Sequence, residues 1–338
     1  MKNIFIIIFL LVSASVFSQT TDSAVYFYQK GLEEKTAKRF LVASQYFDKA
    51  IRLNQKYTAA YIENGYVNLE MHKTDAAKQN FTKVTELDPG NIIANQELIS
   101  LFFAYHQYQN AIDLAQKCKS CANSDKIIAF CYFQLQDFDN AEKLLLKLVK
   151  QNPTDAEMMY TLGRTYMEME LEARAIPFYQ KAIQLDGSKN TWFFELAMLY
   201  YVTDNYKDAV IFFNKATDLG YPQSAELREN LGYAYLYSGE FDKGEKILLN
   251  IHEKKRGDKD IMRDLAQAYY DHKLYDKSLE FCQKLIELDL KDGKALYQAG
   301  LCFQKKGELE RGQQMCDKAI ELDPSLRGLK TKKAGLEF

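Results

Sequence analysis

The residues best suited to chemistry in this 338-residue chain are Cys118 and Cys121, which are separated by two residues. Such a pair can bind zinc when a second pair of ligands completes a tetrahedral site. It can also act as a thioredoxin-like redox pair when a strand and a helix flank it. The sequence shows neither a second pair nor a nearby strand pattern. We therefore expect no zinc site, and predict that Cys118 and Cys121, if oxidised, form a disulfide with each other. The other four cysteines fall on apolar helix registers, where a free thiol packs as a small hydrophobic group: Cys131, Cys282, Cys302 and Cys316.

The other groups that carry catalysis are scattered along the chain. Three of the four histidines, His72, His106 and His272, fall at expected turns. The sequence contains no glycine-rich phosphate loop, no G-x-S-x-G and no H-E-x-x-H, which are the patterns of phosphate sites, nucleophilic serines and zinc hydrolases. We expect no enzymatic activity, no cofactor, no metal ion and no small-molecule substrate.

The composition favours long packed helices. Hydrophobic residues make up 47% of the chain, only five residues are proline, and Tyr and Phe number 23 and 21. Such a content of apolar residues excludes a disordered chain, and so few helix breakers argue against a many-turned β fold. With 44 basic and 46 acidic residues, the formal net charge is −2. Because binding to a phosphate backbone requires a basic excess, we expect no nucleic-acid partner.

The first eighteen residues differ from the rest. Lys2 precedes an unbroken run of nine apolar residues, Ile4 to Val12, and small and polar residues follow as far as Ser18. This is the layout of a secretory signal peptide cleaved after Ser18, and the run is shorter than the roughly 20 residues that span a bilayer. An uncleaved anchor is the weaker alternative. We expect export to the periplasm or the cell exterior, with a mature chain that begins at Gln19.

A repeat runs through the remainder of the chain. One series of small residues recurs at intervals of 34 residues in six of eight cases, with one interval of 30 and one of 35. Its members are Ala43, Ala77, Ala111, Ala141, Ala175, Ala209, Gly244, Ser278 and Gly312. A second series of small residues recurs with the same period, each member at a constant distance before a member of the first series. It includes Gly65, Gly163, Gly232 and Gly300. Because small residues are needed where two helices cross closely, each repeat is predicted to be a pair of helices.

Repeat 156-189 shows the pattern of one pair. The apolar residues of its first half follow the spacing of a helix face, and so do those of its second half. They are Met159, Leu162, Gly163 and Tyr166, then Ala175, Phe178, Tyr179 and Ala182. Asn91 and Asp155 stand where a side chain would cap the following helix, and Pro177 is expected in the first turn of its helix.

The period and the arrangement of small and aromatic residues resemble the tetratricopeptide repeat family. The fullest matches are Tyr61-Gly65-Ala77-Phe81-Pro89 and Leu162-Gly163-Tyr166-Ala175-Tyr179-Ala182. The resemblance implies an all-α, right-handed solenoid of about nine helix pairs, which binds a protein or peptide on a concave face formed by the first helices. With the expected signal peptide, the chain divides into a signal peptide at 1-18, a short lead at 19-23, nine repeats over 24-326 and a capping helix at 327-338.

The third repeat, 92-121, departs from the pattern. It is four residues shorter than most others, has Ile99 where a small residue is expected, and ends at the cysteine pair. Two interpretations stay open. One is drift in a loop, and the other is a change of superhelix curvature, or a hinge, between 92-121 and 122-155.

Aromatic residues gather on the register that would line the concave face. Tyrosine suits a recognition surface because it offers a large rigid area and a hydroxyl group. The candidate peptide-binding residues are Tyr66, Phe103, Phe130, Phe133, Tyr160, Phe194, Tyr201, Tyr233, Tyr237, Tyr270 and Tyr297. The alternative is that several of them belong to the core, as aromatic stripes at helical spacing usually do.

Charges on the same register become more acidic late in the chain, where Glu226, Glu229, Asp260 and Asp271 accompany Arg263. A partner segment with aromatic and basic residues would complement them. The leading hypothesis is therefore an exported adaptor, peripherally associated with the cell envelope, that binds a protein or peptide. A self-assembling structural protein of the envelope and a regulatory subunit of an enzyme are the alternatives.

Overall fold

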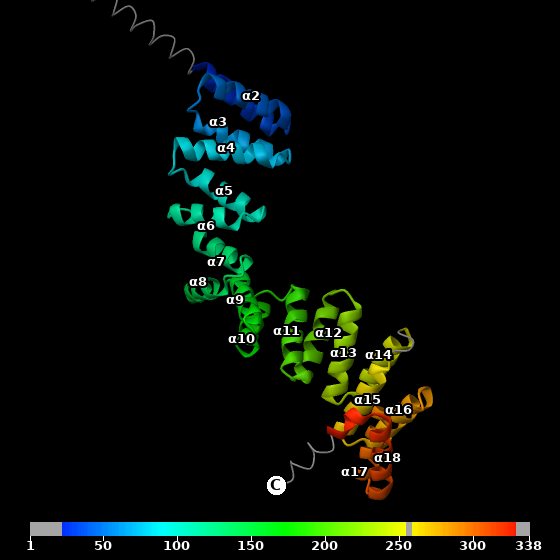
Figure 1. The fold of residues 1–338 in the computed structure, drawn as a ribbon. Coiled ribbons are helices and arrows are strands. Elements are labelled where there is room, and N and C mark those ends of the chain that lie inside the picture. The colour runs from blue at the N-terminus through cyan, green and yellow to red at the C-terminus, as the bar shows by residue number, and fades with distance from the viewer. Residues whose placement is uncertain (1–21, 255–258, 329–338) are drawn as a thin grey trace, which may run out of the picture. The chain divides into compact units, whose positions relative to one another are not determined.

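The computed structural model describes residues 22–254 and 259–328, and every regular element within these ranges is helical (Figure 1). Two compact units divide the chain, Met1–Met169 and Glu170–Phe338, here called the N-terminal and the C-terminal unit. The expected signal peptide lies outside the described residues, and so does most of the expected capping helix. Among the residues described, no helix has both the length and the apolar character needed to cross a bilayer.

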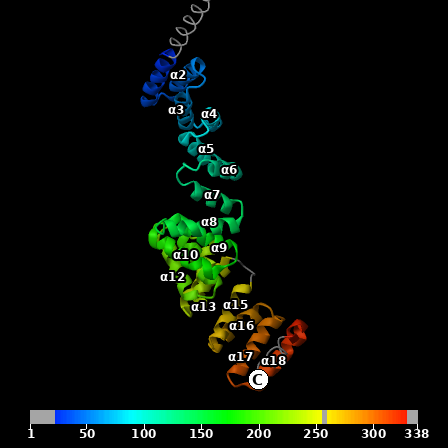
Figure 2. The ribbon, with the colours of Figure 1, turned by 90° about the vertical axis from the view of Figure 1, so that its left-hand side faces the viewer.

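The N-terminal unit consists of four helix pairs and one further helix (Figures 1 and 2). Residues 22–36 are helical and pack against the next helix, since Tyr28 contacts Phe47 across the pair. The later helices are α2 (Phe40–Leu53), α3 (Thr58–Glu70), α4 (Thr74–Leu87), α5 (Ile92–Ala104), α6 (Tyr108–Lys117), α7 (Ser124–Gln134), α8 (Phe138–Gln151) and α9 (Ala156–Glu168).

The C-terminal unit begins with a single helix and continues with four pairs. Its elements are α10 (Glu172–Leu185), α11 (Asn190–Val202), α12 (Tyr206–Asp218), α13 (Ala225–Ser238), α14 (Phe241–Lys254), α15 (Asp260–Asp271), α16 (Tyr275–Leu288), α17 (Gly293–Lys305), α18 (Leu309–Leu322) and the short 3-10 helix η1 (Pro324–Leu326). Taken in chain order, the helices of the two units follow the predicted succession of nine pairs, which confirms the all-α solenoid class.

A left-handed residue occurs in the turn inside each pair, at the same point of every repeat. Nine residues share this positive φ: Lys38, His72, His106, Gln136, Glu170, Asp204, Gly239, Lys273 and Gly307. A single residue in this conformation reverses the chain after a helix, as at a helix C-terminus. His72 and His106 thus lie at solvent-exposed turns, as the spacing predicted.

Small residues allow the two helices of a pair to approach closely. A Cβ atom on Gly244 would lie 2.8 Å from the carbonyl oxygen of Gly232, and one on Gly312 would lie 2.5 Å from that of Gly300. Both distances are shorter than ordinary van der Waals contact, so neither crossing tolerates a side chain. The two predicted series of small residues therefore face each other across the pairs.

The predicted helix caps form, but Pro177 lies deeper in its helix than expected. The side chain of Asn91 accepts a hydrogen bond from the Ala94 amide at 3.1 Å, and that of Asp155 accepts one from Met158 at 3.0 Å. Helix α10 begins at Glu172, so Pro177 is not in the first turn and removes one internal hydrogen bond. The prediction had placed the beginning of this helix too late.

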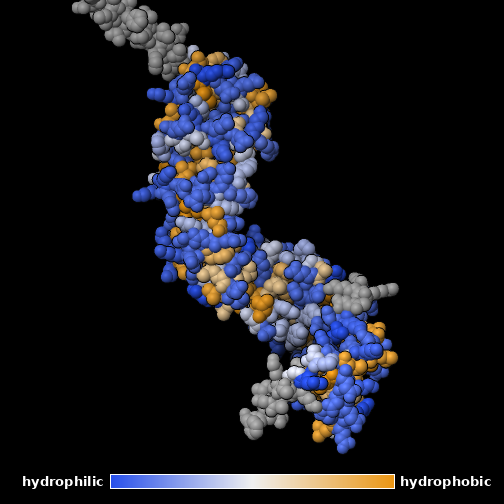
Figure 3. Space-filling model, in the orientation of Figure 1, coloured by the Kyte–Doolittle hydropathy of each residue, from blue (hydrophilic) through white to orange (hydrophobic). Residues whose placement is uncertain are grey.

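On the face drawn in Figure 3, hydrophilic residues cover most of the surface of each unit, and hydrophobic residues form scattered patches. The core of each unit lies between the helices. In the C-terminal unit, for example, Leu236, Leu248 and Phe281 belong to one buried cluster.

Candidate functional site

Three of the predicted binding residues belong to the core instead. The exposed fractions of Phe133, Phe194 and Tyr297 are 9%, 9% and 7%. Phe194 stacks on Tyr221 with ring centroids 4.4 Å apart, and Tyr297 packs in a buried cluster with Cys316. For these residues the core interpretation is correct, because side chains from the following helix or loop cover their rings.

The half-buried candidates of the N-terminal unit interact with other side chains of the chain. The Tyr66 hydroxyl donates a hydrogen bond to Glu97 at 3.0 Å, and burial together with that carboxylate raises the pKa of Tyr66 to about 12. Phe103 makes an edge contact with Tyr108 at 5.7 Å between centroids. Two further candidates on the same register each lie near a cation. The Lys126 ammonium lies 5.5 Å from the centre of the Phe130 ring, and the Arg164 guanidinium lies 6.0 Å from that of Tyr160.

Four tyrosines of the C-terminal unit form a continuous cluster, here called the tyrosine cluster. Tyr201 in the last turn of α11 meets Tyr206, the first residue of α12, edge to face at 5.6 Å between centroids. Tyr206 contacts Tyr237 of α13 at 5.0 Å, and Tyr237 stacks with Tyr233, one turn earlier in the same helix, at 6.1 Å. All four side chains are partly exposed. The cluster therefore joins two consecutive helix pairs through one aromatic surface.

The sequence predicted three members of this cluster and missed Tyr206. The predicted binding face consists of first helices, whereas Tyr206 begins a second helix. A signal was present, because an aromatic pair five residues apart spans the turn at Asp204. The same spacing brings Tyr270 and Tyr275 together at 5.6 Å in a later pair.

Burial and nearby carboxylates both raise the pKa values of the tyrosine cluster. Tyr233 donates a hydrogen bond to Asp264 at 2.6 Å, and Tyr206 donates one to Asp204 at 2.5 Å. Burial raises the pKa of Tyr201 to about 12, and the charges of Asp264, Glu229 and Asp204 act in the same direction. Burial and the neighbouring acidic groups also raise the pKa values of Tyr206, Tyr233 and Tyr237. At neutral pH the phenols of the cluster are therefore protonated.

A cavity of about 190 Å³ adjoins the cluster at Asp264. It lies between α15, α16 and α17, and its polar lining includes Gln267, Lys294 and Gln298. The amide nitrogen of Gln298 is buried there and has no hydrogen-bond partner among the described residues.

The cation next to Asp264 in the sequence is already engaged by other carboxylates. Arg263 donates to Asp292 at 2.9 Å and to Asp260 at 3.0 Å. The Asp292 side chain is only 4% exposed and also caps α17 by accepting a hydrogen bond from the Ala295 amide at 3.0 Å. This arrangement joins consecutive repeats, so Arg263 serves the fold.

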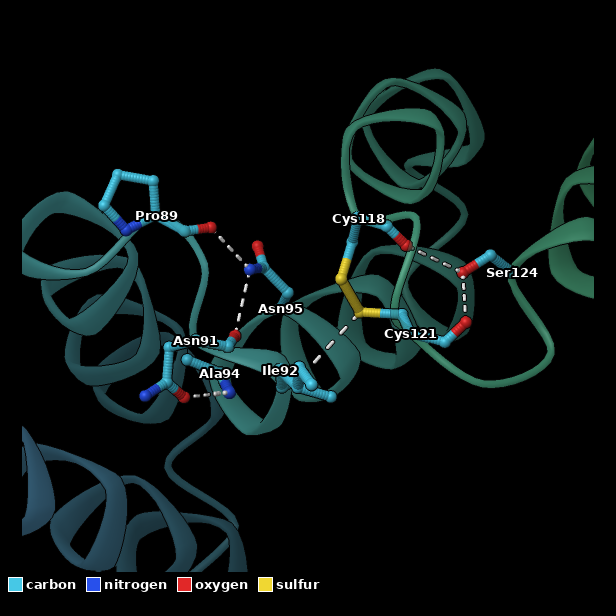
Figure 4. The surroundings of a disulfide bond; sticks show 8 residues. All are labelled: Pro89, Asn91, Ile92, Ala94, Asn95, Cys118, Cys121 and Ser124. Atoms are coloured by element: carbon cyan, nitrogen blue, oxygen red, sulfur yellow. Dashed lines mark hydrogen bonds between the residues drawn. A yellow bond between two sulfur atoms is a disulfide. The ribbon is translucent and has the colours of Figure 1, made fainter.

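In the N-terminal unit, Cys118 and Cys121 form a disulfide beside the beginning of α5 (Figure 4). Their exposed fractions are 9% and 7%, and the Cys121 sulfur lies 3.9 Å from the Ile92 carbonyl oxygen. Ser124 donates a hydrogen bond to the Cys121 carbonyl at 2.9 Å. Helix α6 has 10 residues, whereas α4 and α8 have 14. The disulfide thus links two residues of the turn that directly follows the shortened helix α6.

The remaining cysteines lie outside the disulfide and are buried, in agreement with their apolar registers: Cys131, Cys282, Cys302 and Cys316. Burial raises the pKa of the Cys131 thiol to about 12, so this thiol is unreactive at neutral pH. Across residues 22–254 and 259–328, no group of three or more His, Cys, Asp or Glu side chains could hold a metal ion.

Models of three families match parts of the chain. Two are described as tetratricopeptide repeat and match residues 229–293 and 293–326. The third is described as Coatomer epsilon subunit and matches residues 33–183.

Curated relatives share only part of their length with this chain. The human protein O-mannosyl-transferase TMTC1 is 30% identical over 163 residues, which are 48% of this chain and 18% of that protein. The Bacillus subtilis (strain 168) TPR repeat-containing protein YpiA is 22% identical over 144 residues, or 41% of this chain and 34% of that protein. The match to each of the two human O-mannosyl-transferases spans about a fifth of their length.

Among solved structures, the C-terminal part of a TPR repeat-containing protein from Cytophaga hutchinsonii superposes with a TM-score of 0.51. It is 14% identical in sequence, and the match covers 80% of this chain and 98% of that one. This likeness shows the fold. With the paired helices, their 34-residue period and the two matching repeat models, it shows that the chain is a tetratricopeptide repeat protein.

Proposed function

We propose that this protein is a non-catalytic scaffold that binds a protein or peptide through the tyrosine cluster. Tetratricopeptide repeats generally bind proteins or peptides, which supports the general role. The observation that carries the specific site is the contact series of Tyr201, Tyr206, Tyr237 and Tyr233, partly exposed on consecutive helix pairs. Such rigid aromatic surfaces provide a large share of binding energy in protein interfaces.

The site proposed here is narrower than the aromatic face expected from the sequence. Phe133, Phe194 and Tyr297 are excluded because they are buried. Tyr66 belongs to the N-terminal unit, where its ring contacts the buried Phe81, so it is not a member of the tyrosine cluster. Tyr270 remains a peripheral candidate, because it is partly exposed and lies in the pair that follows the tyrosine cluster.

We also propose that the protein acts in the periplasm or outside the cell, in peripheral association with the envelope. Lys2 and the apolar run that follows it support a cleavable signal peptide. N-terminal sequencing of protein recovered from its native cell should begin at Gln19. Recovery of intact Met1 from a membrane fraction would contradict export with cleavage.

Affinity capture with the tagged mature protein from the cell envelope, followed by mass spectrometry, would identify the partner. The double variant Tyr201→Ala, Tyr233→Ala should lose the captured partner, because truncating a central aromatic residue of an interface typically costs about 2 kcal/mol or more. The matched control is Tyr46→Ala, Tyr105→Ala, which removes two tyrosines of the N-terminal unit and should retain the partner.

Two measurements complete this test. Because the cluster tyrosines are half-buried, helical content and melting temperature are recorded for each variant, and loss of fold would assign the rings to the core. Light scattering should find the pure protein monomeric, whereas defined oligomers would favour the self-assembling alternative. Normal capture by a folded double variant would refute the tyrosine cluster as the site.

A further inference from the structure

A pocket of about 400 Å³ opens in the C-terminal unit where α12, α13 and α14 meet. Its lining comes from residues 214–251, so it belongs to a single junction between consecutive helix pairs. An extended peptide needs a groove that continues along further repeats, whereas pockets for small molecules typically have volumes of about 300–1,000 Å³. The size and the position of the pocket therefore suit a compact ligand.

Aliphatic side chains form the apolar part of the pocket. Leu227 and Leu231 lie about one turn apart on α13. Ile247 and Ile251 have the same spacing on α14, so the two members of each pair share one face of their helix. Leu227 is 1% exposed, and the other three side chains are half-buried. Because removing CH₂ groups from water favours binding, these side chains fit the apolar body of a ligand.

Two cations of the pocket have no carboxylate partner among the described residues. Arg228 on α13 and Lys246 on α14 both line the pocket, and both are exposed. Neither side chain forms a hydrogen bond or an ion pair with another described residue. By contrast Lys243, three residues before Lys246, lies 2.6 Å from Glu240. Guanidinium and ammonium groups in such a position are suited to bind an anionic group of a ligand.

The carboxylates of α13 project away from these cations. At about 100° of rotation per residue, Glu226 lies about 160° around the helix from Arg228, and Glu229 lies about 100° from it. On α14, Glu253 shares the side of Lys246 but follows it by two turns, which is about 10 Å along the helix axis. The described lining of the pocket itself contains no Asp or Glu. Its charged side chains are therefore the two cations alone.

We propose that this pocket binds a small amphiphilic anion, with an apolar body of medium length and one acidic head group. The apolar body packs against the leucines of α13 and the isoleucines of α14. The head group, a carboxylate or a phosphate monoester, accepts hydrogen bonds from Arg228 and Lys246. A guanidinium group binds either head group through two parallel hydrogen bonds, and an ammonium group contributes a point charge.

This site is independent of the tyrosine cluster. Tyr233 lies about 140° around α13 from Arg228, so the two sites use different sides of that helix. The proposal goes beyond the scaffold function and does not rest on it. Its failure would leave the tyrosine cluster untested, and the capture experiment with Tyr201→Ala, Tyr233→Ala decides that site separately.

Calorimetric titration of the mature protein with octanoate, octyl phosphate and octanamide tests the chemistry. Octanamide keeps the shape of octanoate but carries no charge. We expect at least one of the two anions to bind, and octanamide to bind at least about tenfold more weakly than that anion. The six-carbon homologue of the stronger anion should bind at least about fivefold more weakly, since two fully buried CH₂ groups account for roughly fifteenfold. The stronger of the two anions identifies the head group.

A pair of charge variants tests the position of the site. Arg228→Gln with Lys246→Gln should weaken binding of the stronger anion at least about tenfold, because it removes both cations and leaves the apolar lining intact. Lys291→Gln with Lys318→Gln makes the same change of net charge at exposed residues that do not line the pocket. This control should leave the affinity within about twofold. Far-UV circular dichroism verifies that both variants are folded.

Four results would overturn the proposal. They are no binding of either anion, equal affinity for octanamide and the stronger anion, equal affinity for the six-carbon and eight-carbon ligands, and equal losses in the two charge variants. A peptide that alternates glutamate and leucine provides a further comparison. If it binds the parent protein and not Arg228→Gln, Lys246→Gln, while neither amphiphile binds, the pocket belongs to a protein partner and the small-ligand proposal is wrong.

Discussion

Replacing Gly244 by alanine should separate α13 from α14. The added Cβ atom would lie 2.7 Å from the Leu236 amide nitrogen and 2.8 Å from the Gly232 carbonyl oxygen. Both contacted atoms belong to the backbone, so a change of side-chain rotamer cannot relieve the overlap. The two helices must move apart by several tenths of an ångström, which loosens the packing of Leu236 and Leu248, both 0% exposed.

Two opposing terms set the size of the effect. Alanine is favoured over glycine inside a helix by about 1 kcal/mol. Overpacking a well-packed core typically costs about 1–3 kcal/mol, and backbone contacts place Gly244→Ala at the upper end of that range. We expect a net destabilisation of about 1–2 kcal/mol, which corresponds to roughly 2–8 °C in melting temperature for a unit of this size.

Urea unfolding followed by far-UV circular dichroism would measure the loss. The matched control is Gly187→Ala, because a Cβ atom there would meet nothing nearer than the Ile183 carbonyl oxygen at 3.5 Å. The control should lie within about 0.5 kcal/mol of the parent protein. If Gly244→Ala is as stable as Gly187→Ala, the helices do not cross closely at this glycine and the register derived from the small residues is wrong.

Three further predictions concern the free energy of unfolding. Replacing Cys118 and Cys121 by serine should lower it by about 2 kcal/mol, the loop-entropy value for so short a loop, and dithiothreitol should have the same effect on the parent protein and none on the variant. Asp292→Ala removes the cap of α17 and leaves Arg263 without its buried partner, so urea unfolding should show a loss of about 2–3 kcal/mol in the free energy of unfolding. Asp292→Asn should keep the part of that free energy that the helix cap contributes. Because burial raises the pKa of Tyr201 from 10.0 to about 12, the stability contributed by its neutral phenol is complete below about pH 10 and is lost as the pH approaches 12. The urea midpoint of the parent should fall more steeply over that interval than that of Tyr201→Phe, and parallel curves would contradict the assignment.

The repeat period made the fold predictable from a single sequence. Gly232 and Gly244, like Gly300 and Gly312, belong to the two series of small residues that recur with the repeat period, and the structure brings each pair close together at a helix crossing. Such close crossings admit few residue types, so they leave a strong trace in the sequence. Helix ends were harder to place, as Pro177 shows, because propensity changes little over one turn.

Exposure of the aromatic residues could not be predicted in the same way. Tyr160 and Phe194 occupy equivalent positions in consecutive repeats, yet Tyr160 is partly exposed and Phe194 is buried. The repeat that contains Phe194 is one residue longer than the usual 34, and Tyr221, from its connecting segment, stacks on the Phe194 ring. Burial therefore depends on side chains outside the helix that carries the residue, and a helical period contains no information about them.

The partners of the charged residues also depend on how the helices pack. The formal net charge of −2 describes a nearly neutral chain, yet many of its cations lie next to carboxylates on the same helix, as Lys277 does 3.1 Å from Glu280. The opposite charges of such a pair neutralise each other locally, and the pair contributes little to recognition or stability. Two carboxylates of the tyrosine cluster are partnered differently, because Asp264 accepts a hydrogen bond from the Tyr233 phenol and Asp204 accepts one from Tyr206. Which carboxylates meet a cation and which meet a phenol therefore depends on register and packing, which composition does not record.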